Sequence, residues 1–397
     1  MNEVIIFLSG RIDSLNATQV QQDILDQLEG KEIEALMLDL SDLSYISSAG
    51  LQMVLHIRKE YPTLSLVNVS LEVYETLEIT GFTQIMPVQR AYRTLCVEGC
   101  EIIGEGANGI IYRIDRDHVV KLIKTGDLEE IQRTRETSQL AFVLGIPTAI
   151  PYDIVRIGDG YGAVFELLDA QPFSVILAKE PEKTSWCVRE YTDVLKLMHG
   201  TQVPPGRLPS AKQQYLHYLS RIKEELPTED GDKIERMIRD LPEPGTMLHG
   251  DYHVKNIVLA SGEVLLIDME TLSVGHPVFD LAQMYIAYVG FALYNPARVE
   301  NFLGLNAEMA GKFWDECLRS YLGTREGQIL QEIEDKIRVV AFVRLVEWGG
   351  RHLNPNNPEE TAERKLWVRE LIRLLKTVDT LHFEDTLPAG MEPVDRS

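Results

Sequence analysis

The segment HGDYHVKN (249–256) combines residue types that can act on a phosphoryl group. Asp251 and Asn256 are separated by four residues, the spacing at which one loop can offer a carboxylate to an attacking hydroxyl and an amide to a metal ion. Twelve residues after Asn256, Asp268 ends the apolar run EVLLID, where a carboxylate is well placed to bind a magnesium ion that bridges phosphate oxygens. Each residue alone could be a turn or capping residue. Their order and spacing together predict phosphoryl transfer.

A glycine-rich segment, GEGANG (104–109), stands between two predicted strands. Gly104, Gly106 and Gly109 allow a tight turn and a close approach of backbone N–H groups to phosphate oxygens. The segment precedes no helix, as a dinucleotide-binding motif would, and it lacks the Gly-Lys-Ser/Thr ending of a Walker A loop. Glycine-rich hairpins are often simple turns, so this segment is informative only beside the other motifs.

Lys121 follows Gly109 by twelve residues, in the strand-like run HVVKLIK. A lysine in a strand is usually a solvated edge residue, but one strand beyond a glycine-rich hairpin its ammonium could reach the α- and β-phosphates of ATP. We expect Glu136, on the predicted helix 128–145, to hold Lys121 as an ion pair. Glu129 and Glu130 on the same helix compete for this role.

The composition limits the kind of partner. The formal net charge of -22 at pH 7 argues against a nucleic-acid partner, because a phosphate backbone requires a basic surface. No apolar run is long enough to cross a bilayer, and the first residues lack the pattern of a signal peptide. Four cysteines are too few for a disulfide scaffold and complete no zinc site. We therefore expect a cytoplasmic protein without a nucleic-acid or membrane partner.

Two domains follow from the pattern of strands and helices. Residues 1–91 alternate between the two and predict a small α/β sandwich, with strands at 3–12, 35–41, 64–69 and 85–88. Residues 92–170 predict a mostly antiparallel sheet with one helix, an α+β small lobe. Residues 171–397 are mainly helical and include a helical insertion at 205–245. A sheet-rich lobe followed by a helical lobe is the order of a bilobal, protein-kinase-like fold.

Residues 92–397 resemble the aminoglycoside phosphotransferase and choline kinase branch of the kinase-like superfamily, through HGDYHVKN, LLIDME, HVVKLIK and FELL (165–168). The resemblance implies ATP and Mg²⁺ as cofactors. It implies that Asp251 is the catalytic base, that Asn256 and Asp268 bind magnesium, and that Lys121 contacts the ATP phosphates. It further implies that backbone groups of Glu166 and Leu168 meet adenine.

The same resemblance implies that His249 and Asp280, the latter in HPVFDLA, are structural supports of the catalytic loop, although for His249 we favour a satisfied core histidine. His253 stands where a protein kinase places a lysine. Asp280 follows Asp268 by only twelve residues, which leaves no room for a long activation segment. A small-molecule hydroxyl acceptor is therefore favoured over a protein. Its pocket is expected in the helical lobe, near residues that could equally belong to the core: Tyr285, Tyr288, Trp348 and Arg351.

Residues 1–91 resemble the STAS domain of anti-sigma-factor antagonists, through GRIDSLNA (10–17), LDLSDLSYISSAGLQMVL (38–55) and LEITGF (77–82). In that family the serine after an Asp, at the start of a helix, is phosphorylated by a cognate kinase. Ser48 takes this position, but Ser47 replaces the Asp. A serine at a helix start is otherwise simply a cap.

Three hypotheses follow for the function. The leading one is an ATP- and Mg²⁺-dependent phosphotransferase acting on a small-molecule hydroxyl, with an aminoglycoside-like or choline-like acceptor permitted by the acidic composition and a STAS domain for regulation or partner docking. The second is a partner-switching protein whose kinase-like domain phosphorylates a STAS serine. The third is a nucleotide-binding pseudokinase scaffold.

Overall fold

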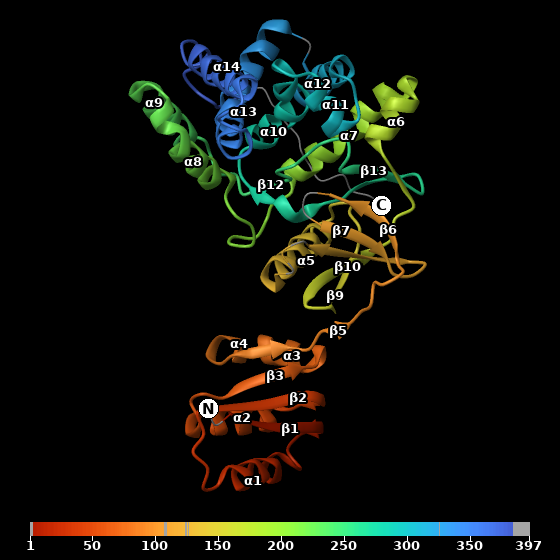
Figure 1. The fold of residues 1–397 in the computed structure, drawn as a ribbon, viewed down its shortest axis with the longest axis vertical. Helices are drawn as coiled ribbons and strands as arrows, with labels where there is room; N and C mark the ends of the chain where they lie inside the picture. Colours follow the sequence, from red (N-terminus) through yellow and green to blue (C-terminus); the bar gives the residue numbers. More distant parts are fainter. Residues whose placement is uncertain (1–2, 107–108, 124, 126, 325, 384–397) are drawn as a thin grey trace. The chain divides into compact units, whose positions relative to one another are not determined.

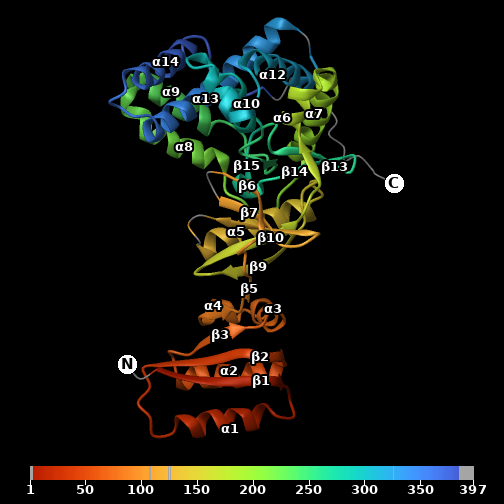
Figure 2. The same ribbon diagram turned by 45° about the vertical axis from the view of Figure 1, so that its right-hand side comes forward.

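The computed structural model describes residues 3–106, 109–123, 125, 127–324 and 326–383, and Figures 1 and 2 show its ribbon in two views. The chain forms two compact units. The first contains the residues up to Val97 together with Ile154–Tyr161, and the second contains Glu98–Asp153 and Gly162 onwards. The predicted boundary near residue 91 thus lies a few residues before the end of the first unit.

The first unit contains a parallel four-stranded sheet in the order β1-β2-β3-β4, of which Figure 1 labels β1, β2 and β3. Its strands alternate with helices, as the pattern predicts. In chain order the elements are β1 (Glu3–Ile12), α1 (Ala17–Leu28), β2 (Ala35–Ile46), α2 (Ser48–Glu60), β3 (Ser65–Val69), α3 (Leu71–Ile79), α4 (Phe82–Ile85) and β4 (Val88–Arg90). The strand expected at 85–88 begins only at Val88, because the preceding residues form the short helix α4.

Burial explains why these segments adopt these elements. Leu36, Leu38 and Leu40 of β2 are fully buried, as expected for a strand inside a parallel sheet. Ile24 and Leu28 of α1, four residues apart on one helical face, are also buried. The regularly spaced apolar residues that predict these strands and helices are therefore the residues that form the core of the first unit.

The second unit begins with an antiparallel sheet in which β10, β8, β7 and β6 are neighbours in that order. The elements of this region are β6 (Glu101–Glu105), β7 (Gly109–Arg113), β8 (His118–Ile123), α5 (Leu128–Val143), β9 (Pro151–Ile157) and β10 (Gly160–Glu166). The ends of β9 and β10 that meet at their turn, residues 154–161, belong to the first unit, where Val155 and Arg156 pair with β5 (Arg93–Thr94).

The rest of the second unit is mainly helical, as predicted, and the expected insertion at 205–245 forms two helices. The helices are α6 (Phe173–Lys179), α7 (Thr184–Gly200), α8 (Ala211–Ile222), α9 (Thr228–Arg239), α10 (Val278–Tyr288), α11 (Ala297–Leu303), α12 (Ala307–Leu322), α13 (Gly327–His352) and α14 (Pro358–Leu374). Short strands and a 3-10 turn lie between α9 and α10: β12 (Met247–Leu248), β13 (Ile257–Ala260), β14 (Glu263–Leu266), η3 (Met269–Thr271) and β15 (Ser273–Val274).

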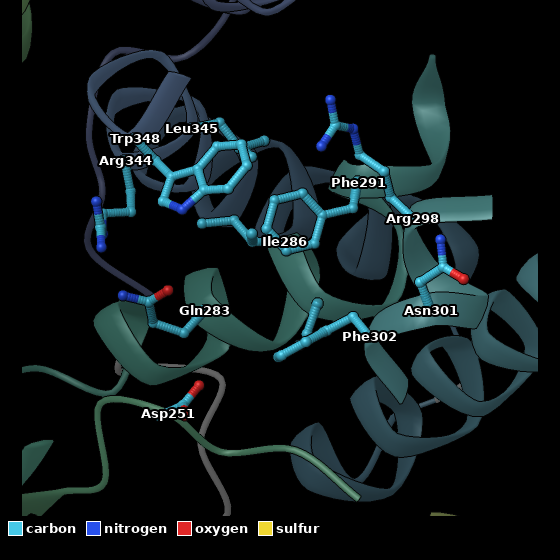
Figure 3. A pocket seen from close by; sticks show the side chains of 11 residues that line it. Asp251, Gln283, Ile286, Phe291, Arg298, Asn301, Phe302, Arg344, Leu345 and Trp348 are labelled. Atoms are coloured by element: carbon cyan, nitrogen blue, oxygen red, sulfur yellow. The ribbon is translucent and has the colours of Figure 1, made fainter. Parts of the chain in front are cut away.

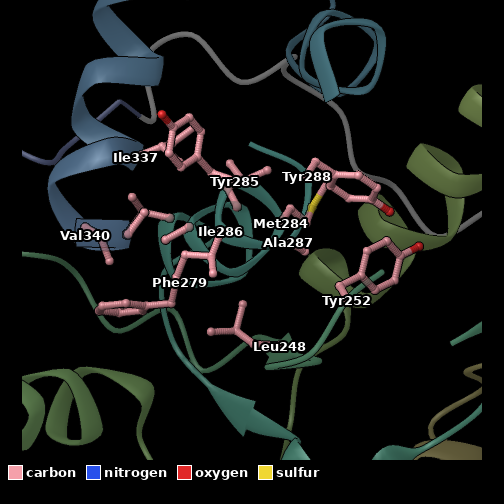
Figure 4. Packing of buried hydrophobic residues seen from close by; sticks show 14 of the residues in the cluster. Leu248, Tyr252, Phe279, Met284, Tyr285, Ile286, Ala287, Tyr288, Ile337 and Val340 are labelled. Atoms are coloured by element: carbon pink, nitrogen blue, oxygen red, sulfur yellow. The ribbon is translucent and has the colours of Figure 1, made fainter. Parts of the chain in front are cut away.

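Helix α10 contacts α12 and α13 in the helical core. Figure 4 shows its buried side chains beside Ile337 and Val340 of α13. Every residue of α10 except Gln283 is buried. A helix that is apolar on all sides must be enclosed by other elements, so α10 is a rigid platform for the residues that project from it. No helix among the described residues is long and apolar enough to cross a membrane.

Candidate active site

The loop that carries Asp251 connects β12 to β13 and is held by a side chain of α10. The carboxylate of Asp280 accepts hydrogen bonds from the backbone N–H groups of His249, at 2.8 Å, and Gly250, at 2.7 Å. Gly250 has a φ of 79°, and a Cβ there would lie 2.4 Å from the carbonyl oxygen of Thr271. Only glycine fits this conformation and this space, so the path of the loop is fixed just before Asp251.

Asp280 belongs to a buried hydrogen-bonded chain. Its Oδ2 lies 3.1 Å from Nε2 of His199, whose Nδ1 lies 2.7 Å from the hydroxyl of Tyr321. Burial alone would raise the pKa of Asp280, but the hydrogen bonds from His199 and from the loop outweigh burial and hold the pKa below its ordinary value. Asp280 is therefore an ionised carboxylate in contact with the loop. This position is compatible with the structural support of the loop that is expected from it.

His249 lies in the same buried environment. Its ring is fully buried, and its Nδ1 accepts the backbone N–H of Asp251 at 3.3 Å. Burial lowers the pKa of His249 more than the nearby carboxylates raise it, so the ring is neutral. Within the described part of the chain its Nε2 has no hydrogen-bond partner. His249 is thus a core histidine that is only partly satisfied, and its one hydrogen bond helps to order the loop.

The side chain of Asp251 is half-exposed, with 47% of its surface accessible. The amide nitrogen of Asn256 donates to the backbone oxygen of Asp251 at 3.0 Å and to its Oδ2 at 3.4 Å, and Nε2 of His253 lies 3.4 Å from the same Oδ2. Burial raises the pKa of Asp251, but His253, His249 and Asn256 together lower it below the ordinary value. Asp251 is therefore ionised at neutral pH and accessible to a ligand.

Asp268 follows β14 and meets Lys121 from β8. Nζ of Lys121 lies 2.8 Å from Oδ1 of Asp268 and 2.6 Å from Oε1 of Glu270. Burial lowers the pKa of Lys121, but the two carboxylates more than offset it, so the pKa is raised and the ammonium is charged. Asp268 has a φ of 65°, which is uncommon for a residue other than glycine and recurs at functional sites.

The expected partner of Lys121, Glu136, is not brought to it. Glu136 is exposed on α5, whose buried residues include Ile131, Thr134 and Ala141 at helical spacing on another face. Glu270 takes the partner role instead. The sequence contains a signal for this residue, because Glu270 comes two positions after Asp268 in LLIDME and shares its turn.

The glycine-rich segment forms the connection between β6 and β7, and two of its residues, 107 and 108, lie outside the described residues. The backbone N–H of Gly106 donates to the carbonyl oxygen of Gly109 at 3.0 Å, so it already has a partner within the hairpin. A Cβ at Gly109 would lie 2.2 Å from the carbonyl oxygen of Leu122 on β8, whereas one at Gly104 would make only ordinary contact with Ile111. Gly109 is therefore required by the close approach of β8.

Replacing Gly109 by alanine is expected to lower the stability of the sheet by about 2 kcal/mol or more, because the backbone of β8 must move to make room. The movement should also displace Lys121, which lies one residue from Leu122, so the affinity for a nucleotide expected to contact Lys121 should fall in parallel. Thermal unfolding and nucleotide titration measure the two effects. Gly106→Ala is the matched control for the stability of the sheet, because nothing lies within 4 Å of its added Cβ. An equal loss of stability in the two variants would contradict this account.

The segment expected to meet adenine, residues 165–168, spans the end of β10. The N–H of Glu166 donates to the carbonyl oxygen of Ile150 at 3.0 Å, and the N–H of Leu167 donates to that of Asp117 at 2.8 Å. These two donors are therefore engaged within the protein. Contact with adenine at this segment would fall to the carbonyl oxygen of Glu166 and the N–H of Leu168.

A cavity of about 470 Å³ opens beside Asp251 in the helical part (Figure 3). Its lining residues are Asp251, Gln283, Ile286, Ala287, Phe291, Arg298, Asn301, Phe302, Arg344, Leu345 and Trp348. Of the residues expected near the acceptor, Trp348 lines this cavity. Tyr285 and Tyr288 are core residues instead, and Arg351 pairs with Glu347. Apart from Asp251 and Trp348, the sequence did not indicate the lining residues, because they come from four segments that are separate in the chain.

The fold and the site define the class of kinase-like phosphotransferases. Residues 100–311, just over half of the chain, match the family model described as the phosphotransferase enzyme family, APH. Residues 2–95 match the STAS domain. The chain belongs to the phosphotransferase enzyme family and carries an N-terminal STAS domain, as the sequence motifs predict.

Known proteins are similar to the STAS domain or to the phosphotransferase part of the chain. The "Putative anti-sigma factor antagonist BtrV" of Bordetella bronchiseptica is 38% identical over 89 residues, 21% of this chain and 76% of the relative. The solved structure of amicoumacin kinase hAmiN, in complex with AMP-PNP, Ca²⁺ and Ami, has a TM-score of 0.50 at 13% identity, covering 77% of this chain and 94% of that one. A choline/ethanolamine kinase family protein from Mesorhizobium loti has a TM-score of 0.45 at 16% identity, covering 70% and 88%. At these identities the likeness to solved structures concerns the fold alone.

Proposed function

We propose that the chain is an ATP- and Mg²⁺-dependent phosphotransferase that moves the γ-phosphate of ATP to a hydroxyl group of a small molecule. The observation that carries the proposal is the meeting of distant segments in one site. Lys121 of the sheet and Asp268 of the turn after β14 lie 2.8 Å apart, and the adjacent loop presents an ionised Asp251 to a cavity large enough for a small acceptor.

Asp251 is the group that would meet the acceptor. Its carboxylate can accept a hydrogen bond from the acceptor hydroxyl, orient the oxygen towards the phosphoryl group and take the proton as the new bond forms. Lys121, held by Asp268 and Glu270, places a positive charge where the nucleotide phosphates would lie. Phosphoryl transfer needs mainly such positioning and charge stabilisation.

Asn256 and Asp268 have the donor chemistry that magnesium requires. The amide nitrogen of Asn256 donates to Asp251, which leaves its amide oxygen as the ligand atom. Within the described residues no group of three His, Cys, Asp or Glu side chains could hold a metal ion by itself. This fits Mg²⁺, which is commonly bound by one or two carboxylates together with nucleotide phosphates. When bound, the ion would neutralise charge on the transferring group.

An ADP-release assay over a panel of hydroxyl-bearing metabolites and antibiotics tests the proposal. We expect at least one acceptor to raise ADP release above the rate with ATP alone, and chelation of Mg²⁺ by EDTA to abolish it. Nucleotide binding without turnover over the whole panel would contradict the proposal and favour a nucleotide-binding pseudokinase scaffold.

A second candidate function is partner switching through the STAS domain, with a protein as its partner. The supporting observation is that Ser48 is exposed and is the first residue of α2, while Ser47 caps that helix by accepting the N–H of Gly50 at 3.5 Å. The capping role therefore falls to Ser47 and leaves the Ser48 hydroxyl accessible. Mass spectrometry after incubation with Mg-ATP tests this candidate. Phosphate on Ser48 that disappears in Asp251→Asn would favour it, and an unmodified Ser48 would count against it.

A further inference from the structure

The charges around the cavity beside Asp251 differ from those of the protein as a whole. The chain has a net charge of -22, yet among the described residues that line the cavity Asp251 is the acidic one, against two arginines, Arg298 and Arg344. A polycationic acceptor would require the opposite balance. The lining therefore has no excess of negative charge with which to bind a polycation.

The two arginines are not equivalent. Arg298 is balanced by one buried partner, Glu363, at 2.8 Å. Arg344 shares its partner Glu347 with two other arginines. Nη1 of Arg344 lies 2.6 Å from Oε2 of Glu347.

The carboxylate of Glu347 is neutralised without Arg344. Arg351 contacts both of its oxygens, with Nε 2.7 Å from Oε1 and Nη2 3.1 Å from Oε2. Nη1 of Arg221 also contacts the carboxylate, at 3.2 Å from Oε1. One buried carboxylate therefore faces three guanidinium groups, and the one that lines the cavity, Arg344, contributes excess positive charge. Because the Arg344 side chain is 19% exposed, solvent screens this charge only in part.

Aromatic rings form part of the apolar lining of the cavity (Figure 3). Phe291 lies with its ring centroid 5.2 Å from that of Trp348 and 6.0 Å from that of Phe302. Such rings could hold a cationic ammonium group. However, the guanidinium of Arg298 already lies 5.9 Å from the Trp348 ring centroid, and His352 stacks on the same indole at 4.9 Å. A second cation at Trp348 would be repelled by Arg298.

We infer that the acceptor has an aromatic or apolar body that packs against Phe291, Phe302 and Trp348, and a carboxylate that pairs with Arg344. A guanidinium binds a carboxylate through two parallel hydrogen bonds, which fixes orientation as well as affinity. The position of the acceptor hydroxyl at Asp251 rests on the proposed function. The preference of the cavity for a carboxylate does not.

Three aromatic alcohols of nearly equal shape test the inference: 4-(hydroxymethyl)benzoate, its neutral amide and 4-(hydroxymethyl)benzylamine. Their affinities are measured by calorimetry and ligand-observed NMR on the full chain. We expect the benzoate to bind roughly tenfold more tightly than the benzylamine, with the amide between them, since a partly buried charge-assisted pair contributes about one order of magnitude. Raising the salt concentration should narrow this difference in the wild type.

Variants at two arginines locate the source of the preference. Arg344→Gln is expected to reduce it to about twofold or less, and Arg344→Lys, which keeps the charge, should retain most of it. Arg221→Gln is the matched control, because Arg221 shares Glu347 without lining the cavity, and its removal leaves Arg351 in contact with both oxygens of Glu347. If Arg344→Gln fails to fold, the lysine variant and the salt dependence of the wild type still decide the question. Tighter binding of the benzylamine, an unchanged preference in Arg344→Gln, or no binding of any of the three would overturn the inference.

ADP release with the same compounds separates this inference from the proposed function. Selective binding of the benzoate without ADP release from any hydroxyl compound would leave the carboxylate site in place and count against phosphotransfer. ADP release with a polycationic aminoglycoside, together with no preference for the benzoate, would support phosphotransfer and overturn the carboxylate site.

Discussion

Asp251→Asn is expected to lower kcat for phosphoryl transfer by roughly 10²- to 10⁴-fold, the usual contribution of a positioned general base. The substitution keeps the shape of the side chain and removes its ability to take the proton of the acceptor hydroxyl. Nucleotide affinity should change little, because the residues expected to hold the nucleotide are Lys121 and Asp268, which pair with each other and not with Asp251. Single-turnover kinetics and nucleotide titration separate the two quantities.

Lys255→Ala is the matched control for Asp251→Asn. Lys255 lies in the same loop, but its side chain is exposed, so its removal should leave both the rate and the nucleotide affinity close to those of the wild type. If Asp251→Asn retained more than about a tenth of the wild-type rate, Asp251 would not be the catalytic base. A large loss of nucleotide affinity in the same variant would assign the residue to binding.

The residues expected to act on the phosphoryl group could be identified from the sequence because they are separated by short spacings. Asp251 and Asn256 lie on one loop, and the hydrogen bond between them depends on five residues of chain. Asp268 follows on the next strand pair, β13 and β14, which holds it beside that loop. Residues on one short loop stay close together in the folded chain, so this motif could be recognised without a structure.

The partner of Lys121 could not be read in the same way. Lys121 and its partners are about 150 residues apart, and the contact depends on how the sheet of the small lobe meets the turn after β14. Glu136 was expected from the order of elements alone, but the rotation of α5 about its axis decides which of its carboxylates faces inward. That rotation is fixed by the buried face that includes Ile131, Thr134 and Ala141, which a sequence argument about charge overlooks.

The cavity beside Asp251 could not be predicted from the sequence either. Tyr285 and Tyr288 lie on α10, where the apolar pattern predicts burial but cannot say which side is open. In the structure the one open side of α10 is at Gln283, which lines the cavity. The excess of arginines around Glu347 could not be predicted either. It depends on the packing of α8 against α13, which brings Arg221 to Glu347 from more than a hundred residues away.

Asp280→Asn is expected to destabilise the second unit by about 3 kcal/mol or more and to abolish phosphotransfer. Asp280 is fully buried and accepts hydrogen bonds from the N–H groups of His249 and Gly250 while it pairs with His199. Asparagine has the same shape, but its NH₂ group would face these donors and leave at least one of them without an acceptor. The catalytic loop would lose the contacts that hold it, even though Asp251 itself is unchanged.

The pH dependence of stability gives a second measure of the same group. The pKa of Asp280 is lower in the folded protein than its ordinary value near 3.9, so the unfolded chain takes up its proton at higher pH than the folded chain does. The stabilisation is therefore complete at neutral pH and is lost as the pH falls below about 4 towards the folded pKa. The asparagine variant should lack this part of the acid dependence.

Tryptophan fluorescence during urea unfolding measures the effect on the correct unit, because the four tryptophans, at 186, 314, 348 and 367, all belong to the second unit. Asp240→Asn, at an exposed position after α9, is the matched control and should unfold like the wild type at pH 7. If Asp280→Asn unfolded at the same urea concentration as this control but had lost its activity, Asp280 would act on the reaction directly. If it kept both stability and activity, the backbone hydrogen bonds to Asp280 would not be what holds the catalytic loop in place.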